Sequence, residues 1–219
     1  MNDPTETLGN GVRVLMSKLA VTLNKLFRGK LNPSHITVLS LLGHLPAAWA
    51  LWNGKTTLAI IFIIVFGLMD ALDGALARVQ KSATKLGMLF DSVSDRLKET
   101  LLYAALAVFV SNNYPEVGVW VVPAVVGTSI FVSYVRARGE TALTNKSEEQ
   151  LNKVFTSGIA RYEIRMSLLI IGLISGFLPS MLNLIIALNL ATASLRFMEV
   201  ARLLSIEDNA NKKTPSKKK

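Results

Sequence analysis

The sequence contains no cysteine among its 219 residues and only two histidines. The absence of cysteine excludes disulfide bonds, thiolate-bound metals and a cysteine nucleophile. The sequence also has few of the polar connectors and alternating patterns that a soluble domain of this length normally shows. Its first dozen residues are polar and acidic, so no cleavable signal peptide is expected.

Long apolar runs are present instead, and 51% of the residues are hydrophobic. Blocks of roughly 17 to 25 apolar residues recur along the chain, which is the length that a helix needs to cross about 30 Å of hydrocarbon. We therefore predict an all-α integral membrane protein with six transmembrane helices, near 34–53, 56–80, 87–112, 116–142, 158–178 and 180–205.

An N-terminal amphipathic interfacial helix is predicted before these spans, near residues 11–29. Its basic and apolar residues alternate at helical spacing, as expected of a helix that lies on anionic lipid. Residues 1–206 are predicted to form a single membrane domain, and residues 207–219 a disordered basic tail.

Positive charge predicts the orientation of the spans. Lysines and arginines precede the first span, lie between the second and third, flank the loop between the fourth and fifth, and end the chain. Only Lys55 lies in a turn on the opposite side. Because basic residues collect on the cytoplasmic side, we expect a multi-pass protein of the cell membrane with both termini in the cytoplasm.

Four aspartates lie where acidic groups are costly. Asp70 and Asp73 are three residues apart, and Asp91 and Asp95 are four apart, so each pair shares one face of a helix. Four facing carboxylates at low dielectric cannot all remain ionised without cations between them. Oxygen ligands suit Mg²⁺ or Mn²⁺, and four acids suffice for two ions.

These acids are also compatible with roles that need no catalytic metal. Some carboxyl groups could be protonated or paired with Arg78, Arg96 or Lys98 at the membrane interface. Intramembrane acids also mark ion paths, so a divalent-cation transporter is an alternative function. A non-catalytic membrane scaffold is a further alternative, but it leaves the aspartate spacing without a cause.

Helix rise predicts the depth of the charged groups. At about 1.5 Å per residue, the aspartates lie roughly 21 to 31 Å below the outer turns, at the inner edge of the hydrocarbon. The same measure brings Arg136, Arg165 and Arg196 to that level. We therefore predict that the acids and the arginines belong to one site that opens to the cytoplasm.

Small residues accompany the acids. Gly74 follows Asp73 directly and Ala77 lies one turn on, which removes side-chain bulk where a ligand could approach the helix. Close packing of membrane helices accounts for small residues equally well. Arg78 is placed for a phosphate contact or for anchoring at the interface.

Read together, the residues from Asp70 to Asp95 give the pattern D-x2-D-G-x2-A-R-x8-G-x3-D-x3-D. The pattern has eight fixed residues at fixed spacing over 26 positions, so it is highly specific. It resembles the signature of the CDP-alcohol phosphatidyltransferases, and the predicted six-span topology extends the likeness over nearly the whole chain.

This resemblance implies a reaction in which an acceptor hydroxyl attacks the β-phosphate of a CDP-linked lipid and CMP leaves. It implies that four aspartates bind two ions of Mg²⁺ or Mn²⁺: Asp70, Asp73, Asp91 and Asp95. It implies that Asp95 also acts as the general base. The residues that it places around the CDP-lipid are Thr37, Asp73, Gly74, Ala77, Arg78 and Gly87. Thr37 ends "NPSHIT", which is similar to the family's "PNxxT", with Ser34 in place of the usual Asn.

Two further segments bear on the acceptor. "SYVRARGE", residues 133–140, resembles a "SYxKARAE" segment of phosphatidylinositol phosphate synthases and their archaeal counterparts, and "GIARYEIR" resembles the "ERxER" that follows there. The arginines implied for an acceptor phosphate are Arg136, Arg161 and Arg196, with Arg138 and Arg165 as helpers. Several arginines suit an anionic acceptor such as inositol phosphate, and positive-inside anchoring is the alternative.

The partners follow from the same resemblance. The donor would be CDP-diacylglycerol or CDP-archaeol, and glycerol 3-phosphate, as in a phosphatidylglycerophosphate synthase, is the rival acceptor. The family likeness implies a homodimer surrounded by membrane lipids. No nucleic-acid partner is expected.

Overall fold

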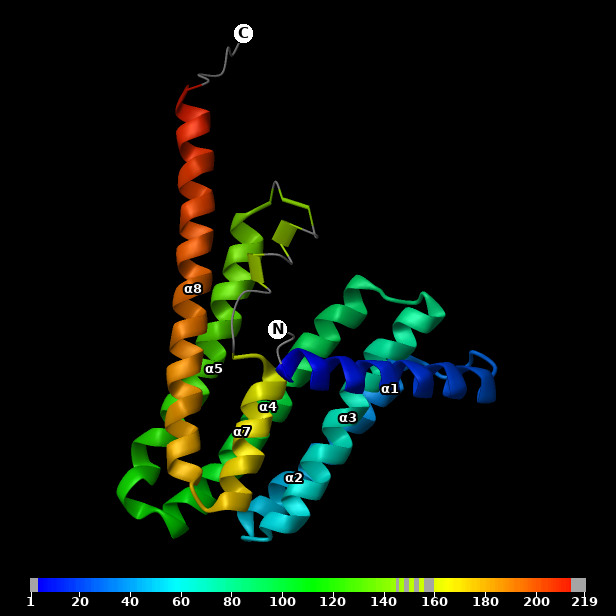
Figure 1. The fold of residues 1–219 in the computed structure, drawn as a ribbon, viewed down its shortest axis with the longest axis vertical. Coiled ribbons are helices and arrows are strands. Elements are labelled where there is room, and N and C mark those ends of the chain that lie inside the picture. Colours follow the sequence, from blue (N-terminus) through cyan, green and yellow to red (C-terminus); the bar gives the residue numbers. More distant parts are fainter. Residues whose placement is uncertain (1–3, 145, 148–149, 152–153, 156–159, 214–219) are drawn as a thin grey trace. The chain divides into compact units, whose positions relative to one another are not determined.

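The structure is a computed structural model that describes residues 4–144, 146–147, 150–151, 154–155 and 160–213. Over these residues the chain forms seven helices and no strand. It divides into two compact units, residues 1–113 and 114–219, each with its own packing (Figure 1).

The first unit contains four helices: α1 (Pro4–Leu26), α2 (Pro33–Trp52), α3 (Thr56–Gln80) and α4 (Lys85–Asn113). Helix α2 is central, because it packs against both α3 and α4. Helix α1 lies across α3 (Figure 1). The core of this contact joins Met16 and Ala20 of α1 to Leu72, Ala75 and Leu76 of α3.

Local signals account for where the helices of this unit begin. Asn32 precedes α2, and its Oδ1 atom accepts a hydrogen bond of 3.0 Å from the Ser34 amide, while Pro33 occupies the first turn. Thr84 precedes α4, and its Oγ1 atom accepts a hydrogen bond of 3.0 Å from the Gly87 amide. The two caps lie at the N-terminal ends of α2 and α4, which carry Thr37 and Gly87. They therefore define the backbone next to these two predicted site residues.

Helices α2 and α3 approach each other closely at a glycine. A Cβ atom on Gly43 would lie 2.1 Å from Cδ1 of Phe66 and 2.2 Å from its Cγ. Ser40, one turn earlier, donates a hydrogen bond of 2.8 Å to the Phe66 carbonyl oxygen. The Phe66 ring therefore occupies the space that any larger residue at position 43 would need.

The second unit contains α5 (Pro115–Ala142), α7 (Tyr162–Ser175) and α8 (Leu178–Lys213). Helix α8 packs against α5 and α7, and it runs beside α5 (Figure 1). Asn189 of α8 donates hydrogen bonds of 3.1 Å to the hydroxyls of Thr128 and Ser129 on α5. A Cβ atom on Gly139 would lie 2.7 Å from Phe155, so this glycine permits the close packing around it.

The predicted all-α class is confirmed, and each predicted span corresponds to a helix. Within the part of the chain that the structure describes, three helices are long and apolar enough to cross a membrane: Thr56–Gln80, Pro115–Ala142 and Leu178–Asn209. The count of six spans therefore stays a prediction. The predicted interfacial helix corresponds to α1, which begins at Pro4 rather than at residue 11. Helix α7 begins at Tyr162 rather than at residue 158, and residues 158 and 159 lie outside the described residues.

The predicted disorder of the tail needs a correction. Helix α8 continues to Lys213, so residues 207–213 are helical, whereas residues 214–219 lie outside the described residues. The stretch from residue 180 to residue 213 contains no glycine or proline and is rich in leucine and alanine, which are strong helix formers.

Candidate functional site

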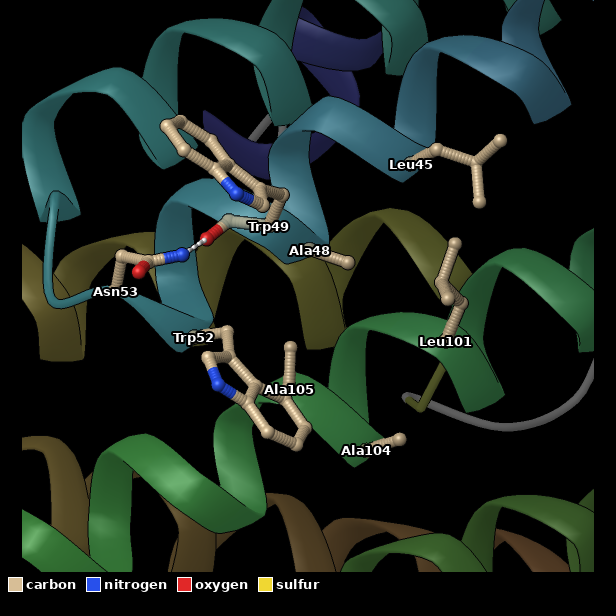
Figure 2. A pocket seen from close by; sticks show the side chains of 8 residues that line it. All are labelled: Leu45, Ala48, Trp49, Trp52, Asn53, Leu101, Ala104 and Ala105. Carbon is tan, nitrogen blue, oxygen red and sulfur yellow. Dashed lines mark hydrogen bonds between the residues drawn. The ribbon is translucent and has the colours of Figure 1, made fainter.

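The groove in Figure 2 lies in the first unit and has a volume of about 490 Å³. It is lined by residues from α2, from the residue that caps α2, and from α4: Leu45, Ala48, Trp49, Trp52, Asn53, Leu101, Ala104 and Ala105. No carboxylate is among these lining residues. None of the residues expected to bind metal, nucleotide or acceptor lies in this groove.

The four aspartates, called here the acid cluster, lie on α3 and α4 of the first unit. Asp70 and Asp73 occupy successive turns of α3, where Asp73 is buried and Asp70 is half-buried. Asp91 and Asp95 occupy successive turns of α4, where Asp91 is exposed and Asp95 is half-buried. The predicted sharing of one helix face by each pair follows from this regular helical geometry.

Lys98 connects the two halves of the acid cluster. Its side chain is fully buried, and its Nζ atom pairs with Asp70 Oδ2 on α3 and, at 2.8 Å, with Asp95 Oδ1 on α4. The pairing with lysine that the sequence left open is therefore present for Lys98. Arg96 instead pairs with Glu99 at 2.5 Å. Lys98 lies three residues after Asp95, a spacing that predicts such a contact.

Thr37 of α2 reaches the acid cluster from a third helix. Its hydroxyl donates a hydrogen bond of 2.5 Å to Asp73 Oδ2, and both side chains are buried. This contact links the "NPSHIT" segment to the aspartate motif, which the sequence alone did not show. The hydroxyl therefore orients the Asp73 carboxylate from the neighbouring helix.

The donor set fits a hard divalent cation, although the carboxylates do not surround one point. Asp70 Oδ1 is buried and has no hydrogen-bond partner among the described residues. A buried carboxylate oxygen without a donor is costly, and a cation would satisfy it. Within the described part of the chain, however, no three acidic, histidine or cysteine side chains are gathered closely enough to hold an ion. The predicted convergence of all four aspartates on two ions therefore stays a prediction.

The small residues of the motif lie beside an arginine. A Cβ atom on Gly74 would lie 3.6 Å from Nη1 of Arg78, so the guanidinium group lies over this glycine. Ala77 precedes Arg78 directly at this end of α3. Gly87 lies in the first turn of α4, where Thr84 caps the helix. The arrangement leaves guanidinium donors accessible beside the small residues of the motif.

Four arginines of the second unit, called here the arginine cluster, are grouped because the charges of three of them act on the fourth, Arg196. They are Arg136 on α5, Arg161 and Arg165 at the start of α7, and Arg196 on α8. Arg165 and Arg196 are buried, and they donate hydrogen bonds to the carbonyl oxygens of Ala160, at 2.6 Å, and Phe155, at 3.0 Å. Burial is not needed for positive-inside anchoring, so anchoring does not account for these two residues.

The remaining arginines are exposed. Arg136 pairs with Glu140 at 2.8 Å, and Arg161 lies directly before the first turn of α7. Arg138 is also exposed. The charges of Arg136, Arg161 and Arg165 act on Arg196, and the binding of an acceptor phosphate by the five predicted arginines stays a prediction. Thr192, which the sequence did not single out, accepts a hydrogen bond of 3.1 Å from the amide of Ala160, two residues before α7.

Comparisons with known proteins were made by sequence and by fold. A sequence model of the CDP-alcohol phosphatidyltransferases matches residues 30–195. The phosphatidylinositol phosphate synthase of Corynebacterium glutamicum is 30% identical over 141 residues, which are 64% of this chain and 60% of that protein. The archaetidylinositol phosphate synthase of Pyrococcus horikoshii is 30% identical over 112 residues, 51% of this chain and 57% of that protein. The matched part of the chain thus spans less than two thirds of these relatives.

A crystal structure of the Mycobacterium tuberculosis phosphatidylinositol phosphate synthase with CDP-DAG bound matches with a TM-score of 0.69 and 21% identity, over 84% of this chain and 92% of that one. A second structure of that protein, in complex with manganese and citrate, matches with a TM-score of 0.69 and 22% identity, over 84% of this chain and 88% of that one. At this level of identity the likeness shows a shared fold.

Proposed function

The chain belongs to the CDP-alcohol phosphatidyltransferase family, and on that premise we propose that it is a transferase of phospholipid biosynthesis. It moves a phosphatidyl or archaetidyl group from a CDP-linked lipid to the hydroxyl of a polyol phosphate and releases CMP. The observation that carries the proposal is the eight-residue motif from Asp70 to Asp95, placed on two helices that both pack against α2.

The acid cluster is proposed to hold two ions of Mg²⁺ or Mn²⁺. When bound, these ions neutralise the charge that develops on the diphosphate as CMP leaves. Asp70 Oδ1, which has no partner among the described residues, supports a cation at this end of α3. A manganese complex of the structurally similar mycobacterial synthase is consistent with the same choice of metal.

Asp95 is proposed as the general base that takes the proton from the acceptor hydroxyl. Lys98 holds its Oδ1 atom, and this contact orients the carboxylate. Arg78 would donate to the phosphates of the nucleotide beside Gly74, which itself carries no side chain. Thr37 would keep Asp73 oriented beneath them.

The arginine cluster is proposed to bind the phosphate of the acceptor, which we infer to be inositol phosphate. Guanidinium groups recognise phosphate with paired hydrogen bonds, and four of them in one cluster favour an anionic acceptor over free inositol or serine. The names of the two sequence relatives support inositol phosphate. Glycerol 3-phosphate is the second candidate because it carries a phosphate as well.

We also propose how the helices are arranged in the membrane. Helices α2, α3, α4, α5, α7 and α8 would form six spans, with both termini and the catalytic residues on the cytoplasmic side. Helix α1 would lie in the interface, which agrees with the exposure of its apolar residues Val14, Leu15 and Leu19. The protein is proposed to act as a homodimer in the cell membrane.

An acceptor assay tests the function. Purified protein with Mg²⁺ or Mn²⁺ is given CDP-diacylglycerol or CDP-archaeol together with inositol phosphate, glycerol 3-phosphate, inositol or serine. We expect CMP release with inositol phosphate and little with the others. Release with no acceptor or with inositol alone would refute the acceptor assignment. Divalent-ion flux in proteoliposomes without nucleotide would instead support a transporter.

A further inference from the structure

Lys98 has no part in the proposed reaction beyond its contact with Asp95, yet it is more deeply buried than any of the four aspartates of the acid cluster. None of its side chain is exposed. Removing an ammonium group from water costs several kcal/mol unless nearby acids compensate it. Here the compensation comes from two helices, because Asp70 lies on α3 and Asp95 on α4.

The atoms that Lys98 contacts belong to residues that the proposed metal site requires. Its Nζ atom pairs with Oδ2 of Asp70 and Oδ1 of Asp95. The second oxygen of Asp70 is buried and has no partner among the described residues. One ammonium charge therefore faces two carboxylates, and the site retains an unsatisfied acceptor that a cation of higher charge would fill.

We propose that Lys98 is a tethered counter-ion of the metal site. In the metal-free protein it holds Asp70 and Asp95 together across α3 and α4. When a divalent cation binds, Lys98 gives up its contact with at least one of these carboxylates. The lysine thereby competes with the cation and lowers the affinity of the site. This inference rests on the proposed function, because it assumes that the acid cluster binds metal.

A lysine that competes with the cation and a lysine that pre-organises the carboxylates predict opposite effects of its removal. If Lys98 held the carboxylates in the geometry that the cation needs, its removal would weaken cation binding. If it competes, its removal strengthens cation binding. The sign of the change in affinity therefore separates the two roles.

The test is Mn²⁺ binding to the nucleotide-free protein in detergent, followed by the electron paramagnetic resonance signal of free Mn²⁺. Lys98→Met keeps the length of the side chain and removes its charge. We expect Lys98→Met to bind Mn²⁺ about tenfold more tightly than the wild type, a typical effect of one close charge pair. Lys85→Met is the matched control, since it removes the same charge from the exposed first residue of α4.

A second variant and a second readout keep the test decisive if Lys98→Met folds poorly. Lys98→Gln retains a hydrogen-bond donor and should also bind Mn²⁺ more tightly. Both variants should melt at a lower temperature than the wild type without metal, and Mn²⁺ should raise their melting temperature more than it raises that of the wild type.

Three outcomes would overturn the inference: unchanged or weaker Mn²⁺ affinity in both variants, an equal gain in Lys85→Met, or failure of both variants to fold with Mn²⁺ present. Because none of these readouts needs turnover, they are distinct from a failure of the proposed function. A wild type that binds Mn²⁺ but releases no CMP would refute the proposed reaction and leave the role of Lys98 intact.

Discussion

Replacement of Gly43 by alanine should weaken the contact between α2 and α3. The added Cβ atom would lie 2.1 to 2.3 Å from three atoms of the Phe66 ring, including Cγ at 2.2 Å. Ordinary carbon–carbon contacts are about 3.5 to 4.0 Å, so the ring or the helix must move by more than about 1 Å. Since Cγ is at the base of the ring, rotation of the ring alone cannot relieve the overlap.

The expected loss in the free energy of unfolding is the difference between two opposed terms. Overpacking of a close-packed interior costs about 3 kcal/mol at the upper end of its usual range. Alanine in place of glycine within a helix stabilises the folded state by about 1 kcal/mol. The net loss of about 2 kcal/mol corresponds to a fall in melting temperature of roughly 4 to 8 °C for a chain of this size.

The assay is thermal unfolding in detergent, with CMP release measured on the same samples. Activity should fall as well, because Thr37 lies six residues before Gly43 on α2 and must stay in contact with Asp73 on α3. Gly67→Ala is the matched control, since a Cβ atom there would have no neighbour within 4 Å.

A second substitution tests the stated cause. Phe66→Leu in the Gly43→Ala background should restore part of the lost stability, because it shortens the obstructing side chain. If Gly43→Ala melts at the same temperature as Gly67→Ala, then α2 and α3 do not approach each other closely at Gly43.

Three other predictions concern the proposed reaction. Asp95→Asn should lower kcat by about 10²-fold or more, while the melting temperature changes little; a kcat within about threefold of the wild type would exclude Asp95 as the base. Thr37→Val should raise KM for the CDP-lipid by about tenfold, because Asp73 loses the hydroxyl that orients it. Thr37→Ser, which keeps the hydroxyl, should retain a near-normal KM. Equal effects of the two substitutions would show that the hydroxyl is irrelevant. Arg161→Ala should raise KM for inositol phosphate by about tenfold, whereas Arg138→Ala, outside the arginine cluster, should raise it less. A larger rise in KM for Arg138→Ala than for Arg161→Ala would contradict the proposed acceptor site.

The sequence by itself was sufficient for the helical class and for the position of each helix to within a few residues at most ends. Apolar blocks of membrane length, with caps such as Asn32 and prolines such as Pro33 and Pro115, are local signals that need no tertiary information. The same holds for the aspartate motif, because spacings of three and four residues determine which side chains share a helix face.

Tertiary structure decided which groups those side chains meet. Lys98 contacts Asp70, 28 positions away, and Thr37 contacts Asp73, 36 positions away, only because α2 packs against both α3 and α4. The burial of Arg165 and Arg196 likewise depends on the packing of α8 against α5 and α7. Helical periodicity defines directions around one axis, and it contains no information about the rotation of one helix relative to the next.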